Sequence, residues 1–412
     1  MSAAGAVGAA GAVDAPNLAP PPGNPRFPLL DSLRALAALA VFAGHTYTGQ
    51  YAFAADPGLF LLAVHVADEG VAIFFLLSGF LLYRPFLVAR RAGRPYPLGD
   101  YVTRRVVRIV PAYWAALTIV IALGFVGGVD GGNWWAFYGF GQIYGPRLIG
   151  QGIGVAWTLC IEVTFYAALP VYAALAARLT RRGGPRAEMI LLGALSAGSL
   201  AYRAHYANLL QTAAISRLPG YVLWFALGMG LAVAGVAGEP VAGRRARVRR
   251  RPARGEWPTT AWPTTAWLAA ALLFVAAHES PHAAPLLGAT GAALVLHVLY
   301  GLAALCLLAP AVFERDAGGP VRRLLARPTL VWLGMVSYGF YLYHTIVIAQ
   351  LARLAADHGI APRYPLVAPA ALVVSAACAA LSFHVLERPL MRLARGRPGS
   401  GPPGSSPRAV RA

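Results

Sequence analysis

The chain has 412 residues, of which 58% are hydrophobic and only 12% are charged, and its mean hydropathy is +0.58. This composition excludes a string of soluble domains and, with repeated apolar runs of about 20 residues, predicts an all-α polytopic membrane bundle. The formal net charge of +19 comes from arginine alone, because the sequence contains no lysine. The arginines cluster between the apolar runs, so membrane topology explains them better than a nucleic-acid partner does.

Three regions are expected. The sequence predicts that residues 1–27 are a disordered cytoplasmic tail, because the first 24 residues lack the basic start and the apolar core of a signal peptide. Residues 28–390 form the membrane domain, and residues 391–412, rich in Gly, Pro, Ser and Arg, predict a second disordered cytoplasmic tail. The three cysteines lie far apart in apolar segments, so they indicate small buried side chains, and no metal site is expected.

Ten apolar runs predict ten transmembrane helices. With a cytoplasmic N-terminus, 29 of the 35 arginines fall in the inner tails and loops and only five fall on the outer side. This bias predicts that both termini are cytoplasmic. The expected spans are residues 30–52, 66–88, 107–127, 155–177, 187–207, 218–237, 262–279, 287–311, 328–352 and 365–387.

The first span carries Arg34 and His45, eleven residues apart. Eleven helical steps end about 20° past three full turns and roughly 16 Å further along, so the two side chains share one face. Asp31 is the expected N-cap. Ionisable groups inside a span usually face the bundle interior and mark a functional path. The alternative is an arginine that extends to the cytoplasmic surface and an incidental histidine.

The third span begins with a cluster of arginines, Arg104, Arg105 and Arg108. Guanidinium groups at the mouth of a bundle suit a phosphate-bearing ligand, because each can bind phosphate with two hydrogen bonds. The positive-inside bias alone is the simpler alternative. Two loops stand out beside this cluster. The outer loop 128–154 is rich in Gly and aromatics, which indicates either an interfacial aromatic belt, the slightly favoured interpretation, or a re-entrant lid. The arginine-rich loop 238–261 predicts a solvated inner loop near anionic lipid headgroups.

The fourth span carries Glu162, with Tyr166 one turn later. Glu162 is expected roughly 10 Å below the outer surface, and His45 lies about 22 Å above the inner one in a core about 30 Å thick. The carboxylate could therefore pair with the imidazole and orient it; a structural glutamate is the alternative. His344 in the ninth span reaches a similar depth.

Two further polar residues of the spans are given structural roles. Glu387, at the inner end of the last span, is expected to form a structural ion pair with the arginine cluster. Ser78, in the second span, indicates helix packing rather than catalysis.

Six segments in order resemble the integral-membrane acyltransferase family 3, which includes polysaccharide O-acetyltransferases, Nod-factor acetyl transferases and macrolide acyltransferases. They are LDSLRALAALAVFAGH, GVAIFFLLSGFLL, YVTRRVVRIVPAYW, WTLCIEVTFY, SYGFYLYH and LERP, and they cover residues from about 30 to 390. The resemblance implies a ten-helix bundle with cytoplasmic termini, acyl-CoA as cytoplasmic donor and an acceptor hydroxyl on the outer side.

The same resemblance matches individual residues of this sequence to motifs of the family. It implies that Arg34 and His45 match the family's essential Arg/His pair and that Arg105 and Arg108 match its Arg-x-x-Arg motif. The chain departs from the family at Ala72, where many members carry an acidic residue. Many relatives also append a soluble esterase-like domain that this sequence does not include, so any helper that handles the acceptor is expected to be a separate protein.

These observations lead to one hypothesis, O-acylation and most simply O-acetylation, in a bacterial cytoplasmic membrane. The acyl-CoA donor, expected to be acetyl-CoA, would bind Arg34, Arg105 and Arg108, and no permanently bound cofactor is expected. His45 and Glu162 are the catalytic candidates, with His45 as general base or acyl-carrying nucleophile. Tyr166 and His344 are candidates for the acceptor side of the pocket.

The acceptor is left open. It is a surface glycan or glycolipid, or alternatively a secreted natural product such as a macrolide. A transporter would usually show inverted repeats, which this sequence lacks. A non-enzymatic scaffold or sensor is the other alternative.

Overall fold

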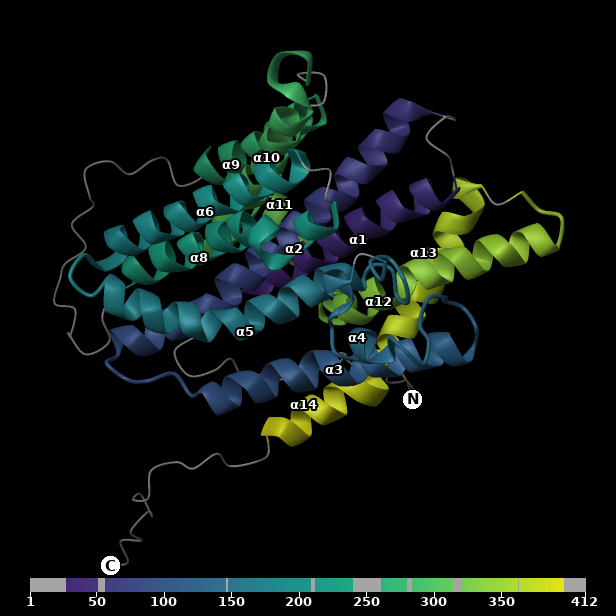
Figure 1. The fold of residues 1–412 in the computed structure, drawn as a ribbon, viewed down its shortest axis with the longest axis horizontal. Helices are drawn as coiled ribbons and strands as arrows, with labels where there is room; N and C mark the ends of the chain where they lie inside the picture. The colour runs from purple at the N-terminus through teal and green to yellow at the C-terminus, as the bar shows by residue number, and fades with distance from the viewer. Residues whose placement is uncertain are drawn as a thin grey trace, which may run out of the picture.

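The computed structural model describes residues 27–50, 56–145, 147–208, 212–239, 261–279, 284–313, 320–361 and 363–395. Within these ranges the regular structure is helical, without a strand, and most long helices run side by side (Figure 1). The all-α bundle predicted from the sequence is therefore confirmed. Residues 1–26, the loop 240–260 and residues 396–412 lie outside the described residues, so the expectations for the two tails and for the arginine-rich loop stay predictions.

A helix forms at each of the ten expected spans. These long helices are α1 (Pro28–Gln50), α2 (Pro57–Arg91), α3 (Leu98–Ala122), α5 (Ala156–Leu179), α6 (Gly184–Asn208), α8 (Val222–Ala237), α9 (Ala261–Glu279), α10 (Ala284–Phe313), α12 (Pro328–Asp357) and α13 (Tyr364–Ser382). The short elements are α4 (Trp134–Tyr138), η1 (Gln142–Tyr144), α7 (Thr212–Ile215), η2 (Leu218–Tyr221), α11 (Pro320–Leu325), the π-helical turn η4 (Phe383–Glu387) and α14 (Arg388–Arg395). Helix α14 continues five residues past the expected end of the membrane domain.

Among the described residues, eight helices are long and apolar enough to cross a membrane, which makes this a multi-pass membrane protein. Helices α6 and α9 are not among these eight. Helix α6 contains Arg186, Glu188 and Arg203, which lower its hydropathy. Both α6 and α9 are helical, as the sequence predicts. The side of the membrane on which each loop of the protein lies stays a prediction.

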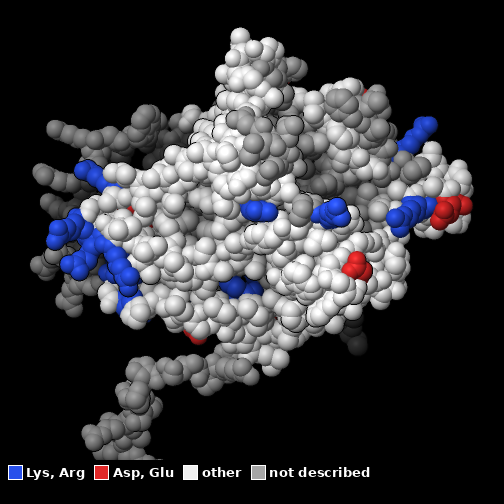
Figure 2. All heavy atoms as spheres, viewed as in Figure 1, with Lys and Arg blue, Asp and Glu red and all other residues white. Residues whose placement is uncertain are grey.

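Charge is distributed unevenly over the surface. Figure 2 shows arginines gathered at the end where the α2–α3 and α5–α6 connections lie, while most of the visible face carries no charge. This end is the one that the arginine bias predicts to face the cytoplasm.

Helix α2 is the central element and packs against α1, α5, α8 and α10. Its contact with α8 is close because two glycines face each other. A Cβ atom on Gly79 would meet the carbonyl oxygen of Phe225, and one on Gly228 would meet that of Leu76. Small residues at such contacts allow the helix backbones to approach each other within a membrane.

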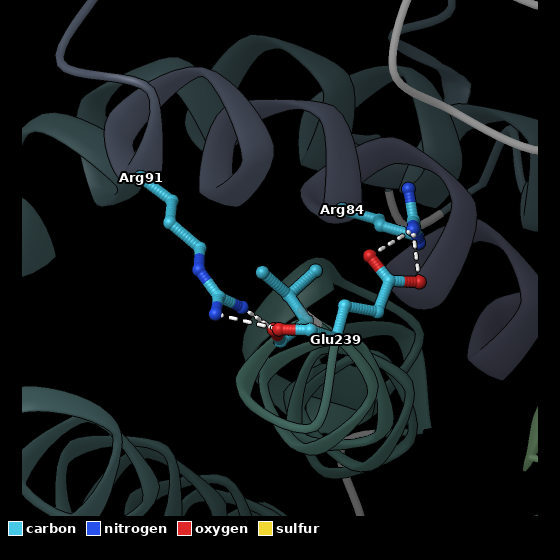
Figure 3. A network of polar contacts seen from close by, with 4 residues as sticks. Arg84, Arg91 and Glu239 are labelled. Atoms are coloured by element: carbon cyan, nitrogen blue, oxygen red, sulfur yellow. Dashed lines mark hydrogen bonds and ion pairs between the residues drawn. The ribbon is translucent and has the colours of Figure 1, made fainter. Parts of the chain in front are cut away.

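Two arginines of α2 hold the end of α8 (Figure 3). Arg84, which is 1% exposed, donates hydrogen bonds of 2.7 and 2.8 Å to the two carboxylate oxygens of Glu239. Arg91 donates to the carbonyl oxygens of Val236 and, at 2.6 Å, Glu239. Carbonyls at a helix C-terminus lack intrahelical partners and carry partial negative charge, so the arginines stabilise this end.

The outer loop between α3 and α5 folds back into the bundle. Trp114 donates a 2.9 Å hydrogen bond to the carbonyl oxygen of Tyr138, and the hydroxyls of Tyr144 and Thr164 lie 3.1 Å apart. Thr164 is eight residues into α5, roughly 12 Å from its start. Phe137 in α4 is fully buried, and α4 lies between α3 and α5 in Figure 1. Phe137 thus anchors the loop between α3 and α5, while Trp134, Trp135 and Tyr144 are exposed, as an interfacial aromatic belt requires. The choice between the two interpretations stays a prediction.

Candidate functional site

A cavity lies between α1, α2, α3, α5 and α12, and the space between its walls, including its opening, measures about 840 Å³. Apolar side chains such as Phe74 and Phe75 form much of its lining. The polar lining includes Arg34, Arg105, Arg108, Glu162, Tyr166 and Ser78. The structure thus brings together all three arginines expected to bind the donor, with Glu162 and Tyr166 beside them.

The cavity carries excess positive charge, three arginines against one glutamate. Arg34 forms a 3.2 Å ion pair with Asp31, one turn earlier on α1. Helix α1 begins at Pro28, so Asp31 lies in its first turn instead of at the N-cap. The Nε atom of Arg105 is buried and has no hydrogen-bond partner among the described residues. Unpaired guanidinium donors in a partly enclosed space are suited to an anionic ligand.

Glu162 is held by two hydroxyl groups. Ser78 of α2 donates a 2.6 Å hydrogen bond to one carboxylate oxygen, and Tyr166 donates a 2.9 Å bond to the other. Ser78 is therefore a polar partner in the site rather than only a packing residue. This finding corrects the expectation drawn from the sequence.

The predicted contact between His45 and Glu162 is wrong. Nδ1 of His45 lies 3.0 Å from Nε2 of His344 on α12, and the two rings are 5.2 Å apart. Equal depth along two helices does not determine the direction in which each side chain points. The carboxylate of Glu162 faces α2, as its bond with Ser78 shows, while His45 lies on the side of α1 that packs against α12.

Tyr341 lies beside the cavity and beside His344. Its side chain lines the cavity, and its hydroxyl lies 2.8 Å from the Thr158 hydroxyl. Its carbonyl oxygen lies 2.8 Å from Nδ1 of His344. Neither His45 nor His344 is among the residues that line the cavity. The histidine pair therefore lies outside the cavity lining, next to Tyr341, whose ring centroid is 5.6 Å from that of His344.

The expected ion pair of Glu387 does not form among the described residues. Glu387 is 3% exposed and accepts a 3.3 Å hydrogen bond from Ser382, five residues earlier. Arg108 attracts this carboxylate electrostatically, but the two groups are not within the 4.0 Å of an ion pair. Ser382 immediately precedes the π-helical turn η4, and Glu387 is the last residue of this turn.

A second polar group was missed by sequence reasoning. Asp68 and Glu69 are adjacent on the apolar helix α2, close to Tyr300 of α10. One carboxylate oxygen of Glu69 and the hydroxyl of Tyr300 are buried without hydrogen-bond partners among the described residues. Two neighbouring carboxylates in a hydrophobic span were the available signal, since such groups are costly in a membrane.

Comparison with known proteins adds a family assignment. A protein-family model described as an acyltransferase domain matches residues 27–384. The acyltransferase MdmB of Streptomyces mycarofaciens is 27% identical over 400 residues, which cover 92% of this chain and 95% of that protein. No solved structure matches the chain.

Two other relatives match shorter segments. Nodulation protein 10 of Rhizobium leguminosarum bv. viciae is 28% identical over 186 residues, 40% of this chain and 48% of that protein. The peptidoglycan O-acetyltransferase OatA of Listeria monocytogenes is 26% identical over 160 residues, 35% of this chain and 24% of that protein. The chain thus spans about half the length of the first of these relatives and a quarter of the second.

Proposed function

The chain belongs to the acyltransferase-domain family, and we propose that it is a membrane O-acyltransferase, most simply an O-acetyltransferase. It moves the acyl group of cytoplasmic acyl-CoA to a hydroxyl of a cell-surface glycan or glycolipid. Its location is the cytoplasmic membrane of a bacterium. Donor and acceptor then approach from opposite sides of the bundle.

The observation that supports this proposal best is the convergence of Arg34, Arg105 and Arg108 on one cavity. Coenzyme A carries several phosphate groups, and guanidinium groups bind phosphate with paired, charge-assisted hydrogen bonds. Glu162 lies among these arginines and attracts Arg34, which offsets part of the repulsion between them. The acyl end of the donor is much less polar, so it is suited to the aromatic walls around Phe74.

His45 is the proposed catalytic residue. The pantetheine arm extends past Arg34 toward Tyr341, and the thioester passes Tyr341 to reach His45. As a general base, His45 takes the proton of the acceptor hydroxyl while the oxygen attacks the thioester carbon. As a nucleophile, it would first accept the acyl group itself. Both routes place the chemistry beside the His45–His344 pair.

The test is acyl transfer by the purified protein in proteoliposomes with radiolabelled acetyl-CoA. The wild type should release coenzyme A and label an acceptor supplied from the membrane glycolipid and glycan fraction. His45→Ala should lose transfer at an unchanged protein level. His358→Ala is the matched control, because His358 is an exposed histidine just after α12. Normal transfer by His45→Ala would refute the catalytic role.

The acceptor class is tested in the same assay. The Listeria relative, named a peptidoglycan O-acetyltransferase, supports a glycan acceptor. The alternative acceptor is a secreted natural product such as a macrolide, and an extract of the culture medium supplies it. Label in the medium extract and none in the glycan fraction would favour the alternative. No thioester cleavage with either fraction would contradict the enzyme itself.

A further inference from the structure

The His45–His344 pair is the most specific polar contact near the cavity that the proposed mechanism has not yet used. Each ring comes from a different helix, and His344 is 1% exposed. Phe42 and Phe340 lie beside His344, with ring centroids 6.4 and 6.2 Å from its own. Water therefore has little access to His344, and its two nitrogens must find partners within the protein.

The partners of His344 determine which of its nitrogens carries the proton. Nδ1 lies 2.8 Å from the carbonyl oxygen of Tyr341. A carbonyl oxygen only accepts hydrogen bonds, so Nδ1 of His344 must be the N–H group. In a neutral imidazole the other nitrogen, Nε2, is then an acceptor.

The same reasoning extends to His45. Nε2 of His344 lies 3.0 Å from Nδ1 of His45. Because Nε2 of His344 accepts, Nδ1 of His45 must donate, and His45 carries its proton on Nδ1. The lone pair of His45 is left on Nε2, the nitrogen that points away from His344. A general base needs a free lone pair of this kind.

We propose that His344 is a positioning residue that fixes His45 in the Nδ1–H tautomer and so presents Nε2 to the acceptor hydroxyl. This inference rests on the proposed function of His45. The acceptor O–H bond breaks and its proton goes to Nε2, while the oxygen forms a bond to the thioester carbon. The carbon–sulfur bond then breaks, and the Nε2 proton passes to the departing thiolate to give coenzyme A thiol.

The hydrogen bond to His344 is present throughout this sequence and strengthens midway. When Nε2 of His45 holds the proton, the ring is a cation, and its Nδ1–H is a stronger donor. The carbonyl of Tyr341 keeps His344 from turning, so the acceptor nitrogen stays in place. His344 thus has the role that a carboxylate has in many catalytic triads, and the structure gives that role to His344 instead of Glu162.

Two substitutions at one position separate positioning from packing. His344→Leu removes the acceptor atom, and we expect kcat to fall roughly 100-fold, since general-base catalysis contributes about 10²- to 10⁴-fold. His344→Gln supplies an amide oxygen that can accept from Nδ1–H, and it should recover at least tenfold of that loss. The KM for acetyl-CoA should stay within about twofold, because His344 does not line the cavity. His358→Leu is the control for the loss of a histidine.

A second readout does not depend on activity. Nitrogen-15 NMR of the full chain in lipid nanodiscs, with labelled histidine, reports the tautomer of His45 and a scalar coupling across the Nδ1–H···Nε2 bond. In the wild type we expect the Nδ1–H tautomer of His45 and this coupling. In His344→Leu we expect neither signal. A His45 proton on Nε2, or wild-type kcat in His344→Leu, would overturn the positioning role. An inactive wild type that still shows the coupling would instead count against the proposed function.

Discussion

Arg104, Arg105 and Arg108 lie within about one turn of α3, yet only the last two line the cavity. Arg104 donates a 3.1 Å hydrogen bond to the Tyr96 hydroxyl and lies 3.8 Å from the carboxylate of Asp100. Successive residues of a helix point about 100° apart, so neighbouring arginines of the same cluster meet different surroundings. Arg104 can therefore serve as the control when phosphate binding by Arg105 and Arg108 is tested.

Arg108→Gln should raise the KM for acetyl-CoA about 10- to 100-fold, because a hydrogen bond to a charged group contributes about 1.5–3 kcal/mol. The measurement is the initial rate of coenzyme A release over a range of donor concentrations. Arg104→Gln, with its partners outside the cavity, should change KM less than about threefold. Equal increases in KM for the two substitutions would show that donor binding depends on the net positive charge of the cluster and not on the position of Arg108 in the cavity.

At the scale of helices, the site depends on where α2 lies. Helix α2 provides Ser78 to Glu162 on one side, and on another it packs closely against α8 through Gly79 and Gly228. The loop between α3 and α5 contacts both helices, because Tyr113 of α3 donates a hydrogen bond to the Phe137 carbonyl oxygen and the Tyr144 hydroxyl lies 3.1 Å from that of Thr164 on α5. Small shifts of α2 would therefore change the cavity without altering any residue that lines it.

Gly79→Leu should destabilise the bundle by about 1–3 kcal/mol, the usual cost of inserting a side chain into a packed interior. The added side chain would collide with the backbone of α8 at Phe225, which cannot move aside as a flexible side chain could. Thermal unfolding in detergent should show a melting temperature several degrees lower. Gly198→Leu is the control, since a Cβ atom there meets open space. A Gly79→Leu protein as stable as the control would contradict the close packing.

For the whole molecule, the described residues form a bundle that carries polar groups at several places. Two of these places are the arginine-rich cavity with Glu162 and the pair Asp68 and Glu69 near Tyr300. Figure 2 shows the largest group of arginines at one end, with single arginines elsewhere on the visible face. If this end is cytoplasmic, α3 begins there and Arg105 and Arg108 are close to the compartment that supplies acyl-CoA.

Membrane topology is tested by labelling single cysteines introduced into a variant without its native ones. Asp130→Cys, in the loop after α3, should react with a membrane-impermeant maleimide in intact cells. Arg182→Cys, between α5 and α6, should react only after the membrane is permeabilised, because the arginine bias places this loop inside. Labelling of Arg182→Cys in intact cells would contradict the predicted orientation.

Most of the fold was predictable from the sequence because membrane spans are local properties. A run of about 20 apolar residues forms a helix in a bilayer whatever its neighbours are, since its backbone must satisfy its own hydrogen bonds. All ten expected spans are helical in the structure, and eight of these helices are long and apolar enough, within the described residues, to cross a membrane. The arginine cluster is different, because a spacing of four residues favours a shared face for Arg104 and Arg108, whereas Arg105 and Arg108 line the cavity and Arg104 does not.

The partners of the buried polar groups were not predictable, because they depend on how the helices rotate and pack. Depth along a helix suggested His45 with Glu162, whereas packing placed His45 against His344 and Glu162 against Ser78. Likewise, periodicity could not show that Tyr341 would line the cavity and also contact His344. The sequence alone determined that the chain folds into a membrane bundle with an arginine cluster. Only the tertiary structure decided which side chains meet, because contacts between helices depend on rotations that no single helix encodes.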